Sequence, residues 1–111
     1  MAKFAELHIA KVYYKGNDEK FKLKPVLVID DSEEGLCTIA EVTSEEPDKN
    51  KYFETFKIEI PEWQSIGLDK KSWVKCHPEN VRRIPTSRIA NCIGSITSKT
   101  MMNVLSKVTT Q

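Results

Sequence analysis

Three polar residues stand at the ends of apolar runs in the first half of the chain. Lys24 directly precedes the run Pro25–Ile29, and Thr43 and Ser44 directly follow the run that begins at Leu36. A lysine cation beside hydroxyl groups can bind a phosphate and stabilise negative charge that develops on it. The alternative is that Lys24 is a solvated flank and that the two hydroxyl residues form a turn. Residue types alone leave both interpretations open.

A hairpin of two strands would bring these residues together. Pro25 suits the first residue of a strand because it has no N–H, and the continuous β-branched run after it is typical of a strand buried on both faces. Residues 30–35 predict the turn, and residues 36–42 predict the second strand. Because an antiparallel hairpin places the start of one strand beside the end of the other, we expect Lys24 and Thr43 to be neighbours at one rim of the sheet.

The rest of the chain predicts more short strands and one closing helix. Alternating or β-branched stretches predict strands at 7–13, 55–60, 72–76 and 80–84 and an extended segment at 89–96. Thr97 or Ser98 can cap a helix whose apolar face repeats at i, i+4 and i+7 from Met101. We therefore expect residues 1–111 to form one domain of mainly β class, a small and strongly bent antiparallel sheet or partial barrel with a C-terminal helix.

Composition is that of an ordinary water-soluble fold, with 40% hydrophobic and 30% charged residues. No apolar run approaches the ~20 residues that cross a membrane, and the start of the chain lacks the features of a signal peptide. A cytoplasmic protein without a membrane partner is therefore expected. The three cysteines form no C-x-x-C pair and only two histidines are present, so we expect free buried thiols and neither a metal nor a cofactor.

The net charge of +1 hides an uneven distribution, because residues 1–29 and 63–111 are basic and residues 30–62 are acidic. Folding can gather the basic segments into one cationic face that attracts a polyanion, or it can interleave the signs so that they cancel. Candidates for contact with nucleic-acid phosphates are Lys20, Lys22, Arg82 and Arg83, although each also fits plain surface charge. Trp73 could stack on a base, or it could be a core or dimer contact.

Three stretches, taken in order, resemble the MazF/PemK family of toxin endoribonucleases, closest to its PemK-like branch. They are K-x-K-P-V-L-V-I with the later A-E-V-T-S, then I-G-L-D-K-K-S-W-V-K-C-H-P-E-N-V-R-R-I, then I-A-N-C-I-G-S-I-T-S-K-T-M-M-N-V-L. The resemblance extends from about residue 8 to residue 108. Each motif is short and apolar, so the resemblance rests on their order and spacing together.

The resemblance implies a fold, an activity and partners. The fold is a compact, strongly curved antiparallel sheet of the SH3-like barrel type, usually in a homodimer. The activity is metal-independent cleavage of single-stranded RNA by the neighbouring 2′-hydroxyl, which leaves a 2′,3′-cyclic phosphate and a 5′-hydroxyl. A cognate antitoxin normally blocks the groove with an acidic, flexible segment.

The resemblance also assigns residues. Thr43 matches the family's active-site threonine, Ser44 would assist it, and Lys24 occupies the place of the family's catalytic arginine. Lysine offers a point charge where arginine offers a planar fork for two phosphate oxygens. Two further departures are the segment His8–Ala10, which replaces the usual G-D, and the acidic loop after Thr43, which would repel RNA unless it points away.

These observations leave three functions open. The first is a ribonuclease of this family, which uses Lys24 and Thr43. The second is a binding module with the same fold and little or no nuclease activity, which binds nucleic acid or protein; the lysine at position 24 and the missing G-D motivate it. The third is a structural or assembly protein, which would make the paired residues at the sheet rim a coincidence.

Overall fold

The strands and helices are taken from a computed structural model that describes residues 2–13 and 19–109. The strands are β1 (Glu6–Tyr13), β2 (Phe21–Asp30), β3 (Leu36–Thr43), β4 (Lys57–Ile60), β5 (Ser72–Lys75), β6 (Val81–Pro85) and β7 (Ile89–Ser95). The α-helices are α1 (Trp63–Ile66) and α2 (Ser98–Thr109), and the 3-10 helices are η1 (Tyr52–Phe56), η2 (Pro78–Asn80) and η3 (Thr86–Arg88). No helix in these two ranges is long and apolar enough to cross a membrane.

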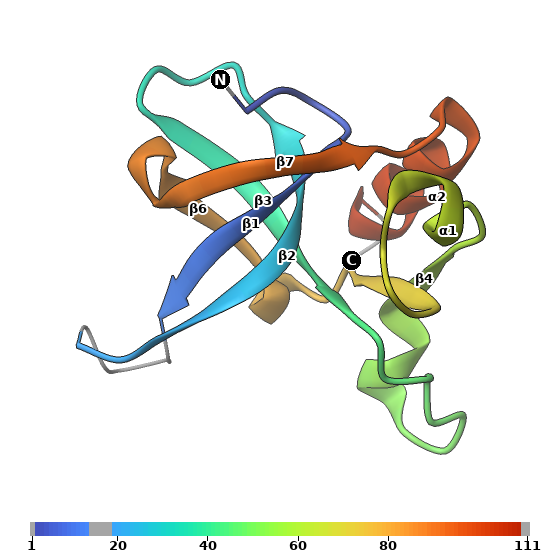
Figure 1. The fold of residues 1–111 in the computed structure, drawn as a ribbon. Coiled ribbons are helices and arrows are strands. Elements are labelled where there is room, and N and C mark those ends of the chain that lie inside the picture. The colour runs from blue at the N-terminus through green and yellow to red at the C-terminus, as the bar shows by residue number, and fades with distance from the viewer. Residues whose placement is uncertain (1, 14–18, 110–111) are drawn as a thin grey trace.

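All pairings between the described strands are antiparallel, in the order β4-β5-β3-β2-β1-β7. The long strand β3 pairs with β2 along one edge; along the other edge its first part pairs with β6 and its end pairs with β5. Strands β7, β1, β2, β3 and β6 thus curve into a barrel wall, which stays open because β6 and β7 do not pair in the described chain (Figure 1). The expected class, a strongly curved antiparallel sheet with a C-terminal helix, is confirmed.

The two faces of the curved sheet hold separate apolar clusters. The alternation of side chains explains the continuous apolar run of β2, because Val26 and Val28 face one cluster and Leu27 faces the other. The concave cluster fills the barrel and includes Ala10, Val12, Val26, Val28, Cys37, Ile39 and Ile84. The other cluster is covered by α2, whose Met101 and Val104 are buried in it. Residues 26–28 of β2 are therefore buried on both sides, as expected for this run, whereas both ends of the strand are exposed.

The hairpin forms with the expected pairing, in which Val26 lies opposite Glu41. The prediction that Pro25 opens the strand is wrong, because β2 begins at Phe21. The ladder with β3 starts only at Val26, so the missing N–H of the proline falls outside that ladder. The strand predicted to begin at residue 55 starts later, at Lys57, because the residues before it form η1.

The start of α2 is held by two side chains. Thr97 is the cap: its Oγ1 accepts a hydrogen bond from the Thr100 N–H at 3.3 Å. Glu62 accepts from the Thr97 N–H at 2.8 Å and from the Thr100 hydroxyl at 2.8 Å. Burial acts to raise the pKa of Glu62, but these hydrogen bonds outweigh it and hold the pKa below its ordinary value. The carboxylate thus fixes the helix against the segment before α1.

Replacing Glu62 by alanine is expected to lower the free energy of unfolding by about 1.5–3 kcal/mol, the usual range for hydrogen bonds to a charged group. Because the folded pKa is depressed, this stabilisation is present above the unfolded pKa and is lost as the pH falls through the folded pKa. Urea unfolding at neutral and acidic pH measures both effects. Glu59→Ala, which removes only an exposed ion pair, is the control. An equal loss in both variants, or a Glu62 effect that persists in acid, would contradict this interpretation.

Candidate active site

A cleft of about 580 Å³ lies at the rim of the sheet where β2 begins and β3 ends. Lys24, Thr43 and Ser44 all line this cleft. Its opposite side is formed by the segment after α1 and by β5, from which Lys70 and Lys75 line it. The structure therefore brings the three residues of the sequence hypothesis into one concave site, in the way that the hairpin geometry requires.

The ammonium group of Lys24 is held by a buried carboxylate that does not line the cleft. Lys24 Nζ donates a hydrogen bond to Glu41 Oε1 at 3.0 Å, and Glu41 is 3% exposed. Arg82 Nη2 lies 3.3 Å from Glu41 Oε2, but this ion pair lacks hydrogen-bond geometry and the oxygen has no hydrogen-bond partner in the described chain. A buried carboxylate needs compensating charge. Lys24 and Arg82, each with a side chain that is one-third exposed, supply it.

Glu41 is the site residue that the sequence hypothesis did not include. The register places Glu41 opposite Val26, so it lies on the same face of the sheet as Lys24. The signal was present in the sequence, because position 41 alternates with Cys37 and Ile39 on the core face of β3. A carboxylate at a core position predicts a cation nearby.

Among the residues that the structure describes, none accepts a hydrogen bond from the Thr43 hydroxyl group, so it can donate to a ligand. Its Oγ1 accepts a hydrogen bond from the Glu45 N–H at 3.1 Å, which leaves the O–H able to donate. The loop that follows is held by Lys57, whose side chain is buried, with 4% of it exposed. Lys57 Nζ donates to the Glu45 carbonyl at 3.3 Å and to Glu54 Oε1 at 2.9 Å. The hydrogen bond from Lys57 also lowers the pKa of Glu54.

The four candidate phosphate contacts occupy different places. Lys22 lines the cleft, and Lys20 is an exposed residue directly before β2. Arg82 is engaged by Glu41 and also donates to the Tyr13 carbonyl at 3.1 Å. Arg83 is exposed, is paired with Glu33, and does not line the cleft. Of these residues only Lys22 shares the cleft with Lys24.

Trp73 lies in β5 directly opposite Thr43. It is 7% exposed, so in this arrangement its ring is not open to a base. Lys71 Nζ lies 5.8 Å from the centre of its ring. The burial of Trp73 favours the core alternative that the sequence left open.

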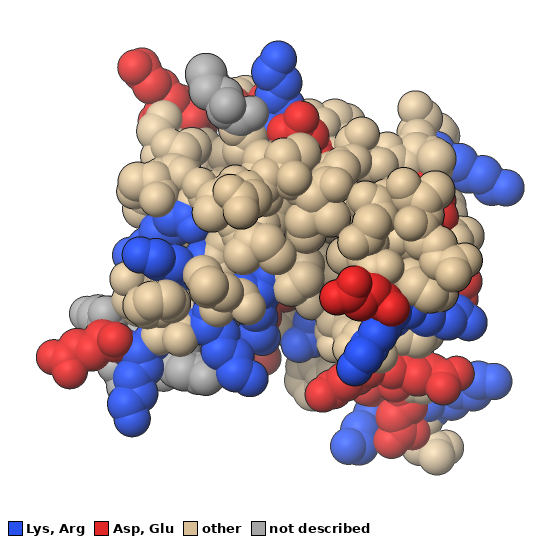
Figure 2. All heavy atoms as spheres, viewed as in Figure 1, with Lys and Arg blue, Asp and Glu red and all other residues tan. Residues whose placement is uncertain are grey.

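Both charge patterns considered from the sequence occur, in different places. Figure 2 shows Lys and Arg side chains gathered at the lower left of this face, near the end of β1 and the start of β2, and a mixture of signs at the lower right. The charged residues that line the cleft are Lys22, Lys24, Lys70, Lys75, Glu45 and Asp69. Of the acidic loop after Thr43, Glu45 alone faces the cleft among the described residues. The cleft therefore has a cationic excess that suits a phosphate chain.

All three cysteines are free thiols, but their burial differs from the prediction. Cys37 and Cys76 are buried, and burial raises the pKa of Cys76 to about 12. Cys92 is exposed, contrary to the prediction, because it lies in β7, the last strand in the order of the sheet. The two buried thiols are unreactive core residues.

The described chain is a small domain whose curved antiparallel sheet carries a lysine-lined cleft at its rim. The family model described as "PemK-like, MazF-like toxin of type II toxin-antitoxin system" matches residues 3–111. The chain therefore belongs to the MazF/PemK family of type II toxins. No curated protein matches its sequence.

Solved structures share the fold at low sequence identity. The MazE-MazF complex from Deinococcus radiodurans is similar with a TM-score of 0.73 and 18% identity, covering 98% of this chain and 94% of that chain. The Mycobacterium tuberculosis toxin MazF-mt6 gives a TM-score of 0.67 and 18% identity, over 95% and 93%. An endoribonuclease in complex with its cognate antitoxin from Mycobacterial species gives 0.70 and 11%, over 99% and 93%. These similarities establish the fold.

Proposed function

We propose that this protein is an endoribonuclease that cleaves single-stranded RNA in the cleft between Lys24 and Thr43, without a metal ion. The observation that carries the proposal is the convergence of Lys24, Thr43 and Ser44 in one lysine-lined cleft of a MazF/PemK-family chain. The cationic lining holds the RNA backbone, and Lys22 is the first candidate for that contact.

The reaction is attack of a 2′-hydroxyl on the adjacent phosphorus. The bond from phosphorus to the 5′-oxygen breaks, and in the overall step one proton leaves the 2′-oxygen and one is gained by the 5′-oxygen. The products therefore carry a 2′,3′-cyclic phosphate and a 5′-hydroxyl. Lys24 stabilises the negative charge that develops on the phosphorane oxygens and can give a proton to the leaving oxygen. The Thr43 hydroxyl donates to a non-bridging phosphate oxygen, and Ser44 assists in holding the same group.

Before RNA binds, the ammonium group of Lys24 is paired with Glu41. A phosphate in the cleft competes with Glu41 for the ammonium group, which sits on a flexible, one-third exposed side chain. Arg82 remains beside Glu41 when Lys24 turns to the substrate. We infer that Glu41 restrains Lys24, so that RNA binding must displace part of this contact.

The partners follow from the same cleft. We propose single-stranded RNA as the substrate and an antitoxin with an acidic segment as the inhibitor that occupies the lysine-lined groove. Two of the similar structures are named as complexes of a toxin with its antitoxin, which supports this partner class. A homodimer and action in the cytoplasm complete the proposal.

Incubation of the purified protein with mixed-sequence RNA in the presence of a chelator tests the function. The proposal expects cleavage that resists the chelator and yields cyclic phosphate ends, detected by their resistance to direct 3′-end ligation. Binding of RNA of varied sequence without any cleavage would instead support the binding module. Absence of both would favour a structural or assembly protein.

A further inference from the structure

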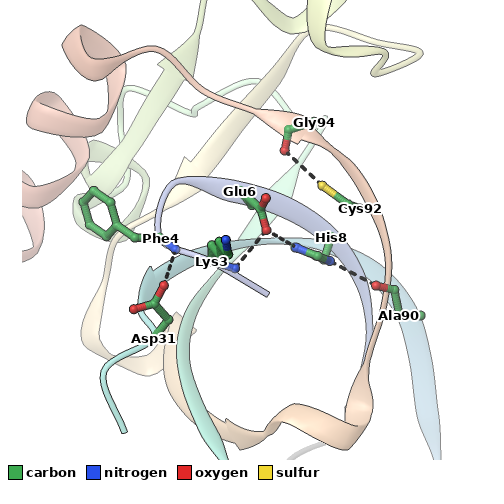
Figure 3. Close-up of polar contacts among 8 residues, drawn as sticks. All are labelled: Lys3, Phe4, Glu6, His8, Asp31, Ala90, Cys92 and Gly94. Carbon is green, nitrogen blue, oxygen red and sulfur yellow. Dashed lines mark hydrogen bonds and ion pairs between the residues drawn. The ribbon is translucent and has the colours of Figure 1, made fainter. Parts of the chain in front are cut away.

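Three side chains of different ligand type meet on one face of the β1–β7 pair. His8 and Cys92 are direct cross-strand partners, and Glu6 lies two residues before His8, on the same side of β1. One ligand atom from each residue lies within 4.8 Å of the other two (Figure 3). A carboxylate oxygen, an imidazole nitrogen and a thiol sulfur are thus gathered from two strands.

The imidazole of His8 is oriented as a metal-binding histidine usually is. His8 is 5% exposed, and its Nδ1–H donates to the Ala90 carbonyl at 3.0 Å. A second nitrogen held in this way fixes the tautomer and direction of a ligating ring. Nε2 then lies 2.9 Å from Glu6 Oε1, and Cys92 lies beside the ring on the neighbouring strand (Figure 3).

The carboxylate of Glu6 is also oriented by hydrogen bonds. Its Oε1 also accepts from the Lys3 N–H at 2.8 Å, which fixes the carboxylate between the N-terminal turn and His8. The hydrogen bonds from His8 and from the Lys3 backbone hold the pKa of Glu6 below its ordinary value, so the group is an anion. A carboxylate that is already oriented by a hydrogen bond from a neighbouring group is well placed to bind a metal ion.

We propose that Glu6, His8 and Cys92 bind a divalent metal ion of the zinc class. Mixed oxygen, nitrogen and sulfur donors are typical of Zn²⁺. Because Cys92 is exposed, the fourth position of a tetrahedral ion opens to solvent and can take water or an outside ligand.

The ligands themselves balance the charge of the ion. The two ring nitrogens of His8 face the Ala90 carbonyl and the Glu6 carboxylate. Metal coordination forms bonds to Oε1, Nε2 and Sγ and releases any protons that Nε2 and Sγ carry. In the bound state the Glu6 carboxylate and the Cys92 thiolate balance the dication, so no uncompensated charge is buried.

The site is separate from the proposed RNA cleft. Glu6, His8 and Cys92 are not among the residues that line the cleft, although His8 and Lys24 share one face of the sheet. On the concave face, the buried Val26 stands between His8 and Glu41 in the register of β1, β2 and β3. The ion would instead join β1 to β7, where the pairing is irregular on both sides of His8. We therefore assign it to stabilising the edge strand.

Binding can be measured on the intact protein without RNA. Equilibrium dialysis against Zn²⁺ is expected to retain one ion per chain, and Co²⁺ is expected to give a thiolate-to-metal charge-transfer band with intense tetrahedral bands. Zn²⁺ is also expected to raise the Tm of the wild type. Cys92→Ala, at an exposed position, should remove the charge-transfer band and weaken binding by at least about 100-fold, more than the loss of an outer hydrogen-bond partner costs.

Cys37→Ala is the matched control, because Cys37 is a free cysteine outside the cluster. It should leave the Co²⁺ spectrum and the Zn²⁺ stoichiometry unchanged. Glu6→Gln provides a second test, since it keeps the size of the side chain and removes the anion. Stoichiometric binding that survives in Cys92→Ala, or no binding by the wild type, would overturn the proposal and leave a plain Glu6–His8 ion pair. Neither result bears on RNA cleavage.

Discussion

Replacing Thr43 by valine is expected to reduce RNA cleavage about 10²–10³-fold, the cost of removing one donor to the charge that develops in a transition state. Valine keeps the shape and removes the hydroxyl, which among the described residues accepts one backbone hydrogen bond. Lys24→Met is expected to cause a loss at least as large, because the cation that faces the phosphorane disappears. Single-turnover cleavage of one RNA, measured in a chelator, gives both values.

Matched controls separate chemistry from folding and from general charge. Thr38→Val changes the same residue type on the same strand, and Lys99→Met removes an exposed lysine of α2; neither residue lines the cleft. Both controls should cleave RNA like the wild type. Cleavage by Thr43→Val at the wild-type rate would remove Thr43 from the reaction. Lys24→Arg adds a planar fork and should retain or raise the rate.

The second large effect is expected in the free energy of unfolding, when the Lys24–Glu41 ion pair is broken. Lys24→Met leaves the buried Glu41 with one cation among the described residues, the poorly oriented Arg82. We therefore expect a loss of about 1–3 kcal/mol, the cost of leaving a buried polar group without its partner. Glu41→Gln should cost less, because it removes the buried charge itself and leaves two cations that reach solvent. The double variant should recover part of the loss of Lys24→Met. Urea unfolding of the four proteins yields the coupling energy.

The same four proteins separate the effect of Glu41 on stability from its effect on RNA cleavage. If Glu41 restrains Lys24, Glu41→Gln should raise RNA cleavage while it lowers stability. The double variant should be as inactive as Lys24→Met, although it is more stable. Additive stability effects would show that the pair is not coupled. A fall in cleavage with Glu41→Gln would show that the carboxylate positions Lys24 for the reaction instead of holding it back.

The hairpin was predictable because residues 26–29 form a continuous apolar run, residues 36–42 are mostly apolar, and the turn between them is polar. That geometry alone placed Lys24 and Thr43 at one rim, and the structure places both in one cleft. The start of β2 was not predictable from Pro25, because β2 extends back to Phe21 by pairing with β1, whereas its ladder with β3 begins only at Val26. The residue at which a strand begins depends on pairing with neighbouring strands, which the local preference of proline does not reveal.

The parts of the sites that the sequence did not indicate are contacts between strands that are far apart in the chain. The core position of Glu41 could have been used to predict a nearby cation, but nothing in the sequence showed that Arg82 of β6 would lie beside it. His8, Glu6 and Cys92 meet because β7 returns to pair with β1, and a count of two histidines gave no hint of it. The exposure of Cys92 likewise follows from the position of β7 in the sheet and not from its neighbours in the chain.

The most direct test of the proposed cleavage in the Lys24–Thr43 cleft uses two RNA oligonucleotides of the same sequence. One is all-ribose, and the other carries a single 2′-deoxyribose at the nucleotide that supplies the attacking hydroxyl. In a chelator, the wild type should cut the first to a 2′,3′-cyclic phosphate and a 5′-hydroxyl and leave the second intact, and Thr43→Val should cut neither appreciably. Equal cleavage of both oligonucleotides, or cleavage of the first by Thr43→Val at the wild-type rate, would contradict the account.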